Sequence, residues 1–179
     1  MSDSQTLVLA GGCFWCTEAV FKQVRGVLDV ESGYSNGQAT APSYEQVCTG
    51  ATGCAEVVKL VYDPGQIGTR QILEIFFLVH DPTQLNRQGH DVGTQYRSGV
   101  YFTTAEQADV AHALIREMSQ DGLYDGAIVT EVAPLAHYFP AEDYHQDFFE
   151  RNPTQGYCVA TAAPKVAKFR QTFRELVKA

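Results

Sequence analysis

The sequence lacks any uninterrupted apolar run long enough to cross a bilayer, for which a helix needs about 20 residues. Its first residues, MSDSQTLVLAGG, also lack the positively charged flank and the long apolar segment of a secretion signal. We therefore expect a cytoplasmic protein that does not bind membranes.

Positive charge is scarce as well. Lysine and arginine number 13 against 21 aspartates and glutamates, which gives a formal net charge of −8 at pH 7. A surface of this sign repels phosphate backbones and anionic lipids, so nucleic acid and membrane are poor candidate partners. An acidic enzyme, or a protein that binds a small molecule, fits this balance better.

No internal repeat, low-complexity segment or Pro/Gly/Ser-rich linker divides the chain. The 179 residues are 45% hydrophobic and 19% charged, which matches one core, and we expect a single domain over residues 1–179. The five cysteines are odd in number and favour reduced thiols over a disulfide framework. The five histidines include no i, i+4 pair on one expected helix, so we expect no metal site.

Short strands and helices alternate along the chain. Apolar and β-branched runs predict strands over residues 6–10, 29–33, 55–62, 99–102 and 127–132. Helical periodicity predicts a first helix from Cys13, further helices over residues 69–79, 105–119 and 141–151, and a last helix after Pro164. The fold class predicted is α/β (α+β): a two-layer sandwich of a mixed sheet with helices packed on it, plus a long C-terminal coil and the final helix.

Three long segments rich in polar residues and glycine lie between these elements, over residues 35–53, 81–98 and 152–163. Loops of this length are uncommon in compact domains unless they form a site or are disordered. We expect them to wall a site at the start of the first helix.

Two cysteines stand three apart in the stretch AGGCFWCTEAVF. Cys13 follows a strand and the pair Gly11-Gly12, where the unpaired N–H groups and the dipole of the coming helix stabilise a thiolate. We expect Cys13 to be the more reactive thiol, with a modestly lowered pKa, because no lysine or arginine occurs before Lys22 and Glu18 lies one turn on.

The spacing of Cys13 and Cys16 leaves three interpretations open. The pair resembles the dithiol of a disulfide oxidoreductase. It also resembles half of a zinc site, with Cys48 and Cys54 as the other half. The protein would then be a non-enzymatic zinc module or a thiol sensor. The third interpretation is one reactive thiol beside an aromatic wall, because Phe14 and Trp15 fill the gap with apolar rings suited to a methyl-bearing substrate.

Five motifs occur in the order of one known family. They are GCFW (12–15), SGYSNG (32–37), PSYEQVCTGATGCAEVV (42–58), HDPTQLNRQGHDVGTQYRS (80–98) and YHQDFFERNP (144–153), and together they span most of the chain. The sequence thereby resembles the peptide methionine sulfoxide reductase A family. This resemblance implies that Cys13 is the nucleophile, that Phe14 and Trp15 hold the substrate methyl group, and that the other catalytic residues are Tyr44, Glu56, Asp91 and Tyr96.

The implied reaction is reduction of methionine-S-sulfoxide, free or in proteins, through a sulfenic acid on Cys13 and an intramolecular disulfide. Thioredoxin or dithiothreitol would regenerate the thiols, and we expect no cofactor and a monomer. Cys158, in a GYC stretch, and Cys16 are the two candidates for the resolving thiol. We favour Cys158, because a mobile loop can approach the sulfenic acid without distorting the helix.

Sulfoxide reduction also needs an acid near the departing oxygen. In the expected strand AEVVKLVYD, alternation places Glu56 on the apolar face of Val58 and Leu60, so burial should raise its pKa and keep it protonated. The chain departs from the family pattern at Cys16, where many members have glycine, at Cys54, where histidine is usual, and at His90, where asparagine is common. We expect Cys48 and Cys54 to be non-catalytic.

Overall fold

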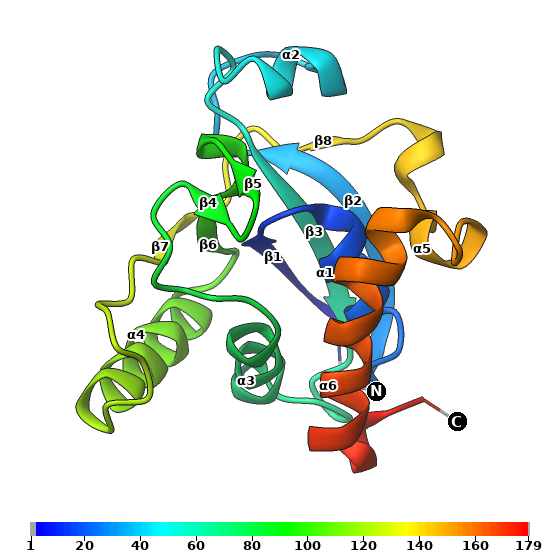
Figure 1. Ribbon diagram of the computed structural model, residues 1–179. Coiled ribbons are helices and arrows are strands. Elements are labelled where there is room, and N and C mark those ends of the chain that lie inside the picture. Colours follow the sequence, from blue (N-terminus) through cyan, green and yellow to red (C-terminus); the bar gives the residue numbers. More distant parts are fainter. Residues whose placement is uncertain (1–2, 179) are drawn as a thin grey trace.

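The computed structural model describes residues 3–178 and has a six-stranded sheet at its centre (Figure 1). The strand order is β7 (Glu131–Pro134), β6 (Ser98–Phe102), β1 (Gln5–Gly11), β3 (Ala55–Tyr62), β2 (Val27–Ser35) and β8 (Phe139–Pro140). Every neighbouring pair is antiparallel except β6 and β7, which are parallel. The sheet is mixed, as the sequence predicts.

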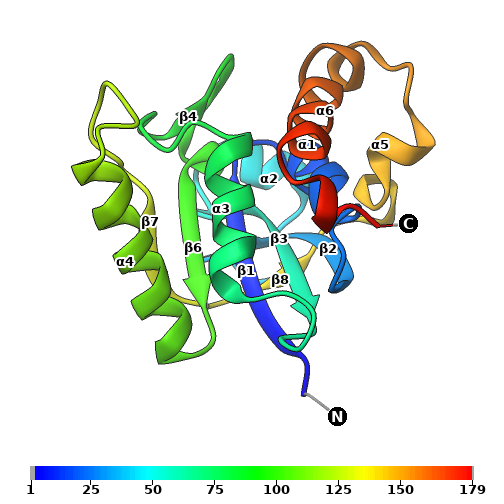
Figure 2. The same ribbon diagram turned by 90° about the horizontal axis from the view of Figure 1, so that it is seen from below.

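Helices cover one face of this sheet. Figure 2 shows this layer, which consists of α1 (Phe14–Phe21), α3 (Thr69–Val79), α4 (Ala105–Gln120) and α6 (Ala163–Thr172). The main apolar core lies between the helices and the sheet and includes Leu7, Leu60 and Phe76, all fully buried. The predicted fold class, helices packed on a mixed sheet, is confirmed.

A smaller apolar cluster covers the other face. The chain between β7 and β8 returns across that face, and there Leu135 and Tyr138 pack on Val8, Val57 and Tyr101. Because successive strand residues point to opposite faces, Val57 contributes to this cluster while Val58 and Leu60 contribute to the main core. The alternation predicted for β3 is therefore present.

The prediction of one helix over residues 141–151 is wrong. The chain there forms a 3₁₀ turn, η2 (Asp143–His145), and one short helix, α5 (Phe148–Arg151). Asp147 separates them with a φ of 56°, in the left-handed region that a helix cannot continue through. The Gln146 side chain also bonds the Ser32 backbone on β2, which ties this segment to the sheet edge.

Two other boundaries differ from the sequence prediction. The strand expected over 127–132 begins only at Glu131, because the Val129 N–H donates to the Pro82 carbonyl instead of to the sheet. The final helix ends at Thr172, and a 3₁₀ turn, η4 (Arg174–Leu176), leads the chain back to bond residues 23 and 25. Part of the expected C-terminal coil is a π-helical turn, η3 (Cys158–Ala162), that runs directly into α6.

The first two long loops also contain short elements. The first holds α2 (Tyr44–Cys48), whose start is fixed by a capping box between Ser43 and Gln46. The second holds a small hairpin, β4 (Arg87–Gln88) with β5 (Asp91–Val92), followed by a 3₁₀ turn, η1 (Thr94–Tyr96). Both loops lie at the end of the sheet where α1 begins (Figure 1).

The turn between β1 and α1 depends on Gly12. Its φ is 91°, and a Cβ at this position would meet the Gln88 side chain at 2.7 Å.

Within residues 3–178, no helix is long and apolar enough to cross a membrane.

Candidate active site

Cys13 is the N-cap residue of α1. Its backbone has the extended ψ of 125° typical of that position, and its carbonyl accepts the Cys16 N–H at 3.1 Å. The residue is partly exposed, whereas Cys16 is buried on the first turn of the helix. Each thiol shifts the pKa of the other, so they titrate as one pair.

The pKa order of this pair is the reverse of our expectation. Burial raises the pKa of the Cys13 thiol well above its ordinary value, and the neighbouring Cys16 thiol and Glu56 raise it further. The start of the helix does act as predicted, because the backbone N–H of Trp15 lowers the pKa of Cys13. The effect of burial on this pKa is larger. The pKa of Cys16 falls to about 7, chiefly through its hydrogen bond with Cys13 and then through the charge of Lys165. The prediction of a modestly lowered pKa for Cys13 is therefore wrong.

Glu56 projects from β3 towards the start of α1 and is 1% exposed. Its Oε1 accepts the backbone N–H of Phe14 at 3.3 Å, and its Oε2 accepts the side-chain Nε2–H of Gln95 at 3.2 Å. Burial raises the pKa of this carboxyl to about 8, although both hydrogen bonds lower it. The carboxyl is thus protonated at neutral pH, as the alternation in β3 predicted.

Phe14 and Trp15 differ in their surroundings. Phe14 is 1% exposed and packs among the rings of Tyr34, Tyr44 and His145, with centroid distances of 5.6, 6.4 and 5.0 Å. Trp15 is half-buried and lies parallel to Phe148, with centroids 3.7 Å apart. The position of its ring is therefore fixed from outside α1.

A buried histidine also fixes the indole ring. The Trp15 Nε1–H donates to His145 Nδ1 at 3.0 Å, so the neutral imidazole carries its proton on Nε2. Burial lowers the pKa of His145, which keeps it neutral at pH 7. Sequence reasoning missed this role, because it searched the histidines for metal-ligand spacing alone.

Tyr44 and Tyr96 come from the two structured loops. Tyr44 begins α2, and its backbone N–H donates to Glu142 Oε2 at 2.9 Å, while Tyr96 ends η1. Burial raises the pKa of both phenols, and the charge of Glu56 is the next cause for each. The structure therefore brings both hydroxyl-bearing rings into the field of the Glu56 carboxyl.

Asp91 is engaged by a residue that the sequence reasoning did not single out. The Tyr157 hydroxyl donates to Asp91 Oδ2 at 2.5 Å and accepts the Cys16 thiol at 3.7 Å. The Tyr157 ring also meets the edge of Trp15, with centroids 5.8 Å apart and planes at 80°. The residue directly precedes Cys158, so the GYC stretch was the available signal.

The remaining thiols occupy different environments. Cys158 is fully buried at the start of η3, and burial, followed by the charge of Cys16, raises its pKa. Cys48 is exposed at the end of α2, and its sulfur accepts the Gln95 Nε2–H at 3.4 Å. Cys54 is buried near Thr52. All five cysteines are free thiols.

No group of three or more His, Cys, Asp and Glu side chains among residues 3–178 is arranged to hold a metal ion. The thiols of Cys13, Cys16, Cys48 and Cys54, considered as zinc ligands, are not gathered into one such group.

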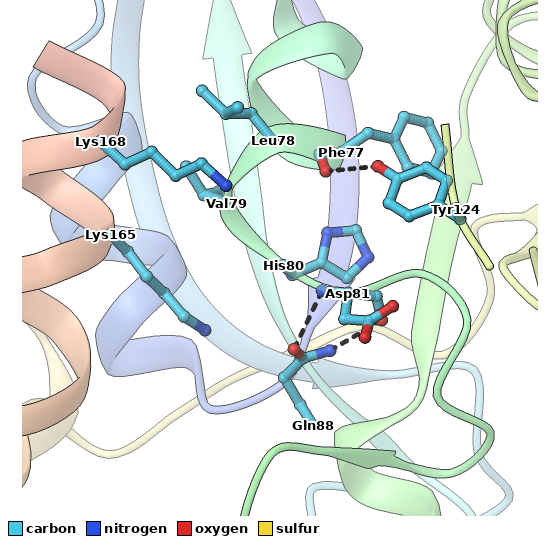
Figure 3. A pocket seen from close by; sticks show the side chains of 9 residues that line it. All are labelled: Phe77, Leu78, Val79, His80, Asp81, Gln88, Tyr124, Lys165 and Lys168. Carbon is cyan, nitrogen blue, oxygen red and sulfur yellow. Dashed lines mark hydrogen bonds between the residues drawn. The ribbon is translucent and has the colours of Figure 1, made fainter. Parts of the chain in front are cut away.

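A cavity of about 430 Å³ lies behind this site, between the end of α3 and α6 (Figure 3). Lys165 and Lys168 reach towards it from α6, and Tyr124 lies on the opposite side. Gln88 closes one end through two 3.0 Å hydrogen bonds with the Asp81 backbone. Lys165 also borders a second cavity of about 140 Å³ that reaches Asp91 and Tyr157, which places its charge beside the site.

Comparison with known proteins gives one consistent result. A family model described as peptide methionine sulfoxide reductase matches residues 5–177. The peptide methionine sulfoxide reductase MsrA of Haloquadratum walsbyi is 54% identical over 172 residues, which cover 96% of this chain and 98% of that protein. The MsrA of Polynucleobacter asymbioticus is 51% identical over 169 residues, which cover 94% of this chain and 89% of that protein.

Solved structures agree with these relatives. Mxr1 from Saccharomyces cerevisiae in its reduced form has a TM-score of 0.81 at 34% identity, and the match covers 89% of this chain and 91% of the Mxr1 chain. A structure of Mxr1 in complex with Trx2 matches with a TM-score of 0.56 at 22% identity, which shows similarity of fold alone.

Proposed function

The chain belongs to the peptide methionine sulfoxide reductase A family, and from that premise we propose that it reduces methionine-S-sulfoxide, free or peptide-bound, to methionine. One observation carries the proposal. A buried carboxyl, Glu56, is kept protonated near neutral pH and is hydrogen-bonded to the backbone N–H directly after Cys13. An acid and a thiol are thereby placed together, as the reduction of a sulfoxide requires.

The first step is attack of the Cys13 sulfur on the sulfoxide. The sulfoxide oxygen is transferred to Cys13, which becomes a sulfenic acid, while the substrate sulfur gains two electrons and leaves as a thioether. Glu56 donates its proton to the oxygen as the S=O bond breaks. Cys16, whose pKa is lowered to about 7 and which lies one helical turn after Cys13, accepts the Cys13 proton.

The aromatic wall supplies recognition. Phe14 and Trp15 offer apolar rings to the methyl group, and the stack on Phe148 holds Trp15 in place. Tyr44 and Tyr96 donate hydrogen bonds to the sulfoxide oxygen. Asp91 binds the substrate backbone nitrogen or a water molecule through the acceptor sites that its hydrogen bond with Tyr157 leaves free.

The sulfenic acid is resolved by a second thiol, with release of water and formation of a disulfide. The position of Cys16 one helical turn after Cys13 and its lowered pKa support Cys16 for this first exchange. Cys158, favoured on the sequence alone, is fully buried in the resting structure, and we assign it the later transfer towards an external reductant. Both assignments are part of the proposal.

Thioredoxin is the proposed reductant, with dithiothreitol as its laboratory substitute, and no cofactor takes part. Mxr1 has been solved in complex with Trx2, which supports a thioredoxin partner for the family fold. We also propose that the protein is a monomer and, on the sequence grounds given above, that it works in the cytoplasm.

The test is turnover of racemic methionine sulfoxide, first with dithiothreitol and then with thioredoxin. We expect the native chain to consume half of the racemate with either reductant and the Cys13→Ser variant to consume none. Cys158→Ser should keep turnover with dithiothreitol, and Cys16→Ser should slow it, because Cys16 accepts the Cys13 proton in the first step. Both variants should fail with thioredoxin, since each thiol carries one step of the recycling. If the native chain leaves the sulfoxide untouched but reduces protein disulfides, the dithiol interpretation of Cys13 and Cys16 replaces this proposal.

A further inference from the structure

We propose that Gln95 is a positioning residue for Glu56: its amide holds the carboxyl against the start of α1 and sets the pH range in which the acid keeps its proton. The inference rests on the proposed function, because it concerns the same acid. Neither the sequence motifs nor the chemistry of sulfoxide reduction assigned a role to this side chain.

The geometry of the carboxyl carries the inference. Gln95 is 4% exposed, and its Nε2–H donates to Glu56 Oε2 at 3.2 Å. The Phe14 N–H donates to Oε1 at 3.3 Å. Each carboxyl oxygen therefore accepts one N–H, which fixes the plane of the group, and each keeps a lone pair that can carry the acid proton.

A second partner fixes the orientation of the Gln95 amide. The Nε2 group has two N–H donors, and the second acceptor within reach is the Cys48 sulfur at 3.4 Å. With the amide reversed, its oxygen would face the Cys48 sulfur and, once Glu56 ionises, a carboxylate oxygen that cannot donate to it. Cys48 and Glu56 together thus hold the nitrogen of Gln95 towards the carboxyl.

The backbone places Gln95 for this task. It occupies the middle of η1, one residue before Tyr96, and Gly93 precedes the turn with a φ of 143° that favours glycine. One short turn therefore supplies both a tyrosine and the amide that faces Glu56.

Several titratable groups share the field of Glu56, so the contribution of the amide has to be separated from theirs. They are the thiols of Cys13 and Cys16 on α1, the carboxyl of Asp91 on β5, and the phenols of Tyr34 on β2, Tyr44 on α2 and Tyr96 on η1. Burial raises the pKa of Glu56 to about 8, although the two N–H donors lower it. Loss of the amide donor should therefore raise this pKa further.

The decisive measurement is a ¹³C NMR titration of the Glu56 carboxyl in the full chain labelled at glutamate, assigned with Glu56→Gln. In Gln95→Met, which keeps the length and loses the donors, we expect the pKa of Glu56 to rise by about one unit. In Gln95→Glu, which is nearly isosteric, a second carboxyl should raise it more. An unchanged or lowered pKa of Glu56 in both variants overturns the proposal.

The control is a second buried glutamine. Gln107 on α4 is 1% exposed and bonds the Thr6 carbonyl and the Tyr62 hydroxyl, so Gln107→Met also removes a buried amide. We expect it to lower the free energy of unfolding without moving the pKa of Glu56 or the pH profile. An equal shift in Gln107→Met would show a general loss of stability and overturn the positioning role.

Kinetics provide the second readout. With dithiothreitol as reductant, kcat/KM should fall on the alkaline side of the pH profile as Glu56 loses its proton. Gln95→Met should shift this fall to higher pH and lower the maximal kcat/KM about tenfold. Failure of the proposed function is distinguishable, because a chain without sulfoxide reductase activity still reports the pKa of Glu56 in the NMR titration.

Discussion

The backbone N–H of Phe14 donates a hydrogen bond to Glu56 Oε1 at 3.3 Å. Phe14 directly follows the proposed nucleophile, Cys13, and Glu56 is the second residue of β3. One bond thus joins the helix that holds the thiol to the strand that holds the acid. The first prediction concerns that acid.

Glu56→Gln should lower kcat/KM for methionine sulfoxide by about 10²- to 10³-fold, because an amide cannot supply the proton that the departing oxygen needs. The variant should also lose the alkaline limb of the pH profile, since the group that titrates near pH 8 is gone. Steady-state rates from pH 6 to pH 10 with dithiothreitol check both. Native rates in Glu56→Gln would mean that another group protonates the oxygen.

The same carboxyl should make the folded state less stable as the pH rises. Its folded pKa of about 8 lies above the ordinary value of 4.5, so between these values the folded state holds a proton that the unfolded state has released. The contribution of this proton to the free energy of unfolding is fully present below pH 4.5 and is lost as the pH rises through 8. Between these values the free energy of unfolding should fall with a slope approaching about 1.4 kcal/mol per pH unit.

Urea unfolding at several pH values between 5 and 8 measures this slope. Glu56→Gln should flatten it, and the part that remains should come mainly from Glu18, a second buried carboxyl whose pKa burial raises to about 7. The prediction fails if the native chain and Glu56→Gln lose stability equally over this range.

The fold was predictable where the pattern was regular. Strict alternation in β3 and helical spacing in α3 and α4 identified these elements and placed Glu56 on a buried face. The segment from 141 to 151 misled, because its residues suit a helix locally. Its course depends on contacts with β2, such as the Gln146 bonds to Ser32, that no local pattern contains.

The site shows the same division. Motifs indicated Cys13, Glu56 and the aromatic pair, because the family resemblance implies a role for each of them. Gln95, His145, Phe148 and Tyr157 act through partners 39 to 133 residues distant in the sequence, and only the folded chain shows those pairings. The reversed pKa order of Cys13 and Cys16 likewise depends on burial and on Lys165, which the helix start alone could not reveal.

Lys165→Met should raise the pKa of Cys16 above its present value of about 7, because the positive charge that stabilises the thiolate is removed. Titration of thiolate absorbance in the ultraviolet measures the change. Lys168→Met is the matched control, since Lys168 also lines the large cavity but is not among the causes of the Cys16 shift. Equal shifts in the two variants would contradict a specific effect of Lys165.

Phe148→Ala should raise KM for methionine sulfoxide several-fold while kcat changes little. The parallel stack on Trp15, with centroids 3.7 Å apart, fixes the indole, and such pairs contribute about 0.5–1.5 kcal/mol beyond the buried area. Phe149→Ala serves as the control, because Phe149 packs on the main core and should affect stability alone. If KM rises equally in both variants, the stack has no particular role in binding.

Tyr157→Phe should expose Cys158. The Tyr157 hydroxyl connects Asp91 and Cys16, so it ties the start of η3 both to the hairpin and to α1, and in this state Cys158 is fully buried. Its transfer to an external reductant requires the segment to detach. Hydrogen bonds to charged groups contribute about 1.5–3 kcal/mol, so loss of the hydroxyl should increase the detached population about tenfold or more.

Alkylation of the native chain by iodoacetamide, followed residue by residue with mass spectrometry, measures that population. We expect Cys158 to react about tenfold faster in Tyr157→Phe, with Cys54 unchanged as an internal reference. Tyr124→Phe controls for the loss of a tyrosine hydroxyl, because that group bonds the Phe77 carbonyl at 2.9 Å, away from η3. An unchanged rate at Cys158 would show that Tyr157 does not restrain the segment, and packing of η3 on α1 would then be what holds Cys158.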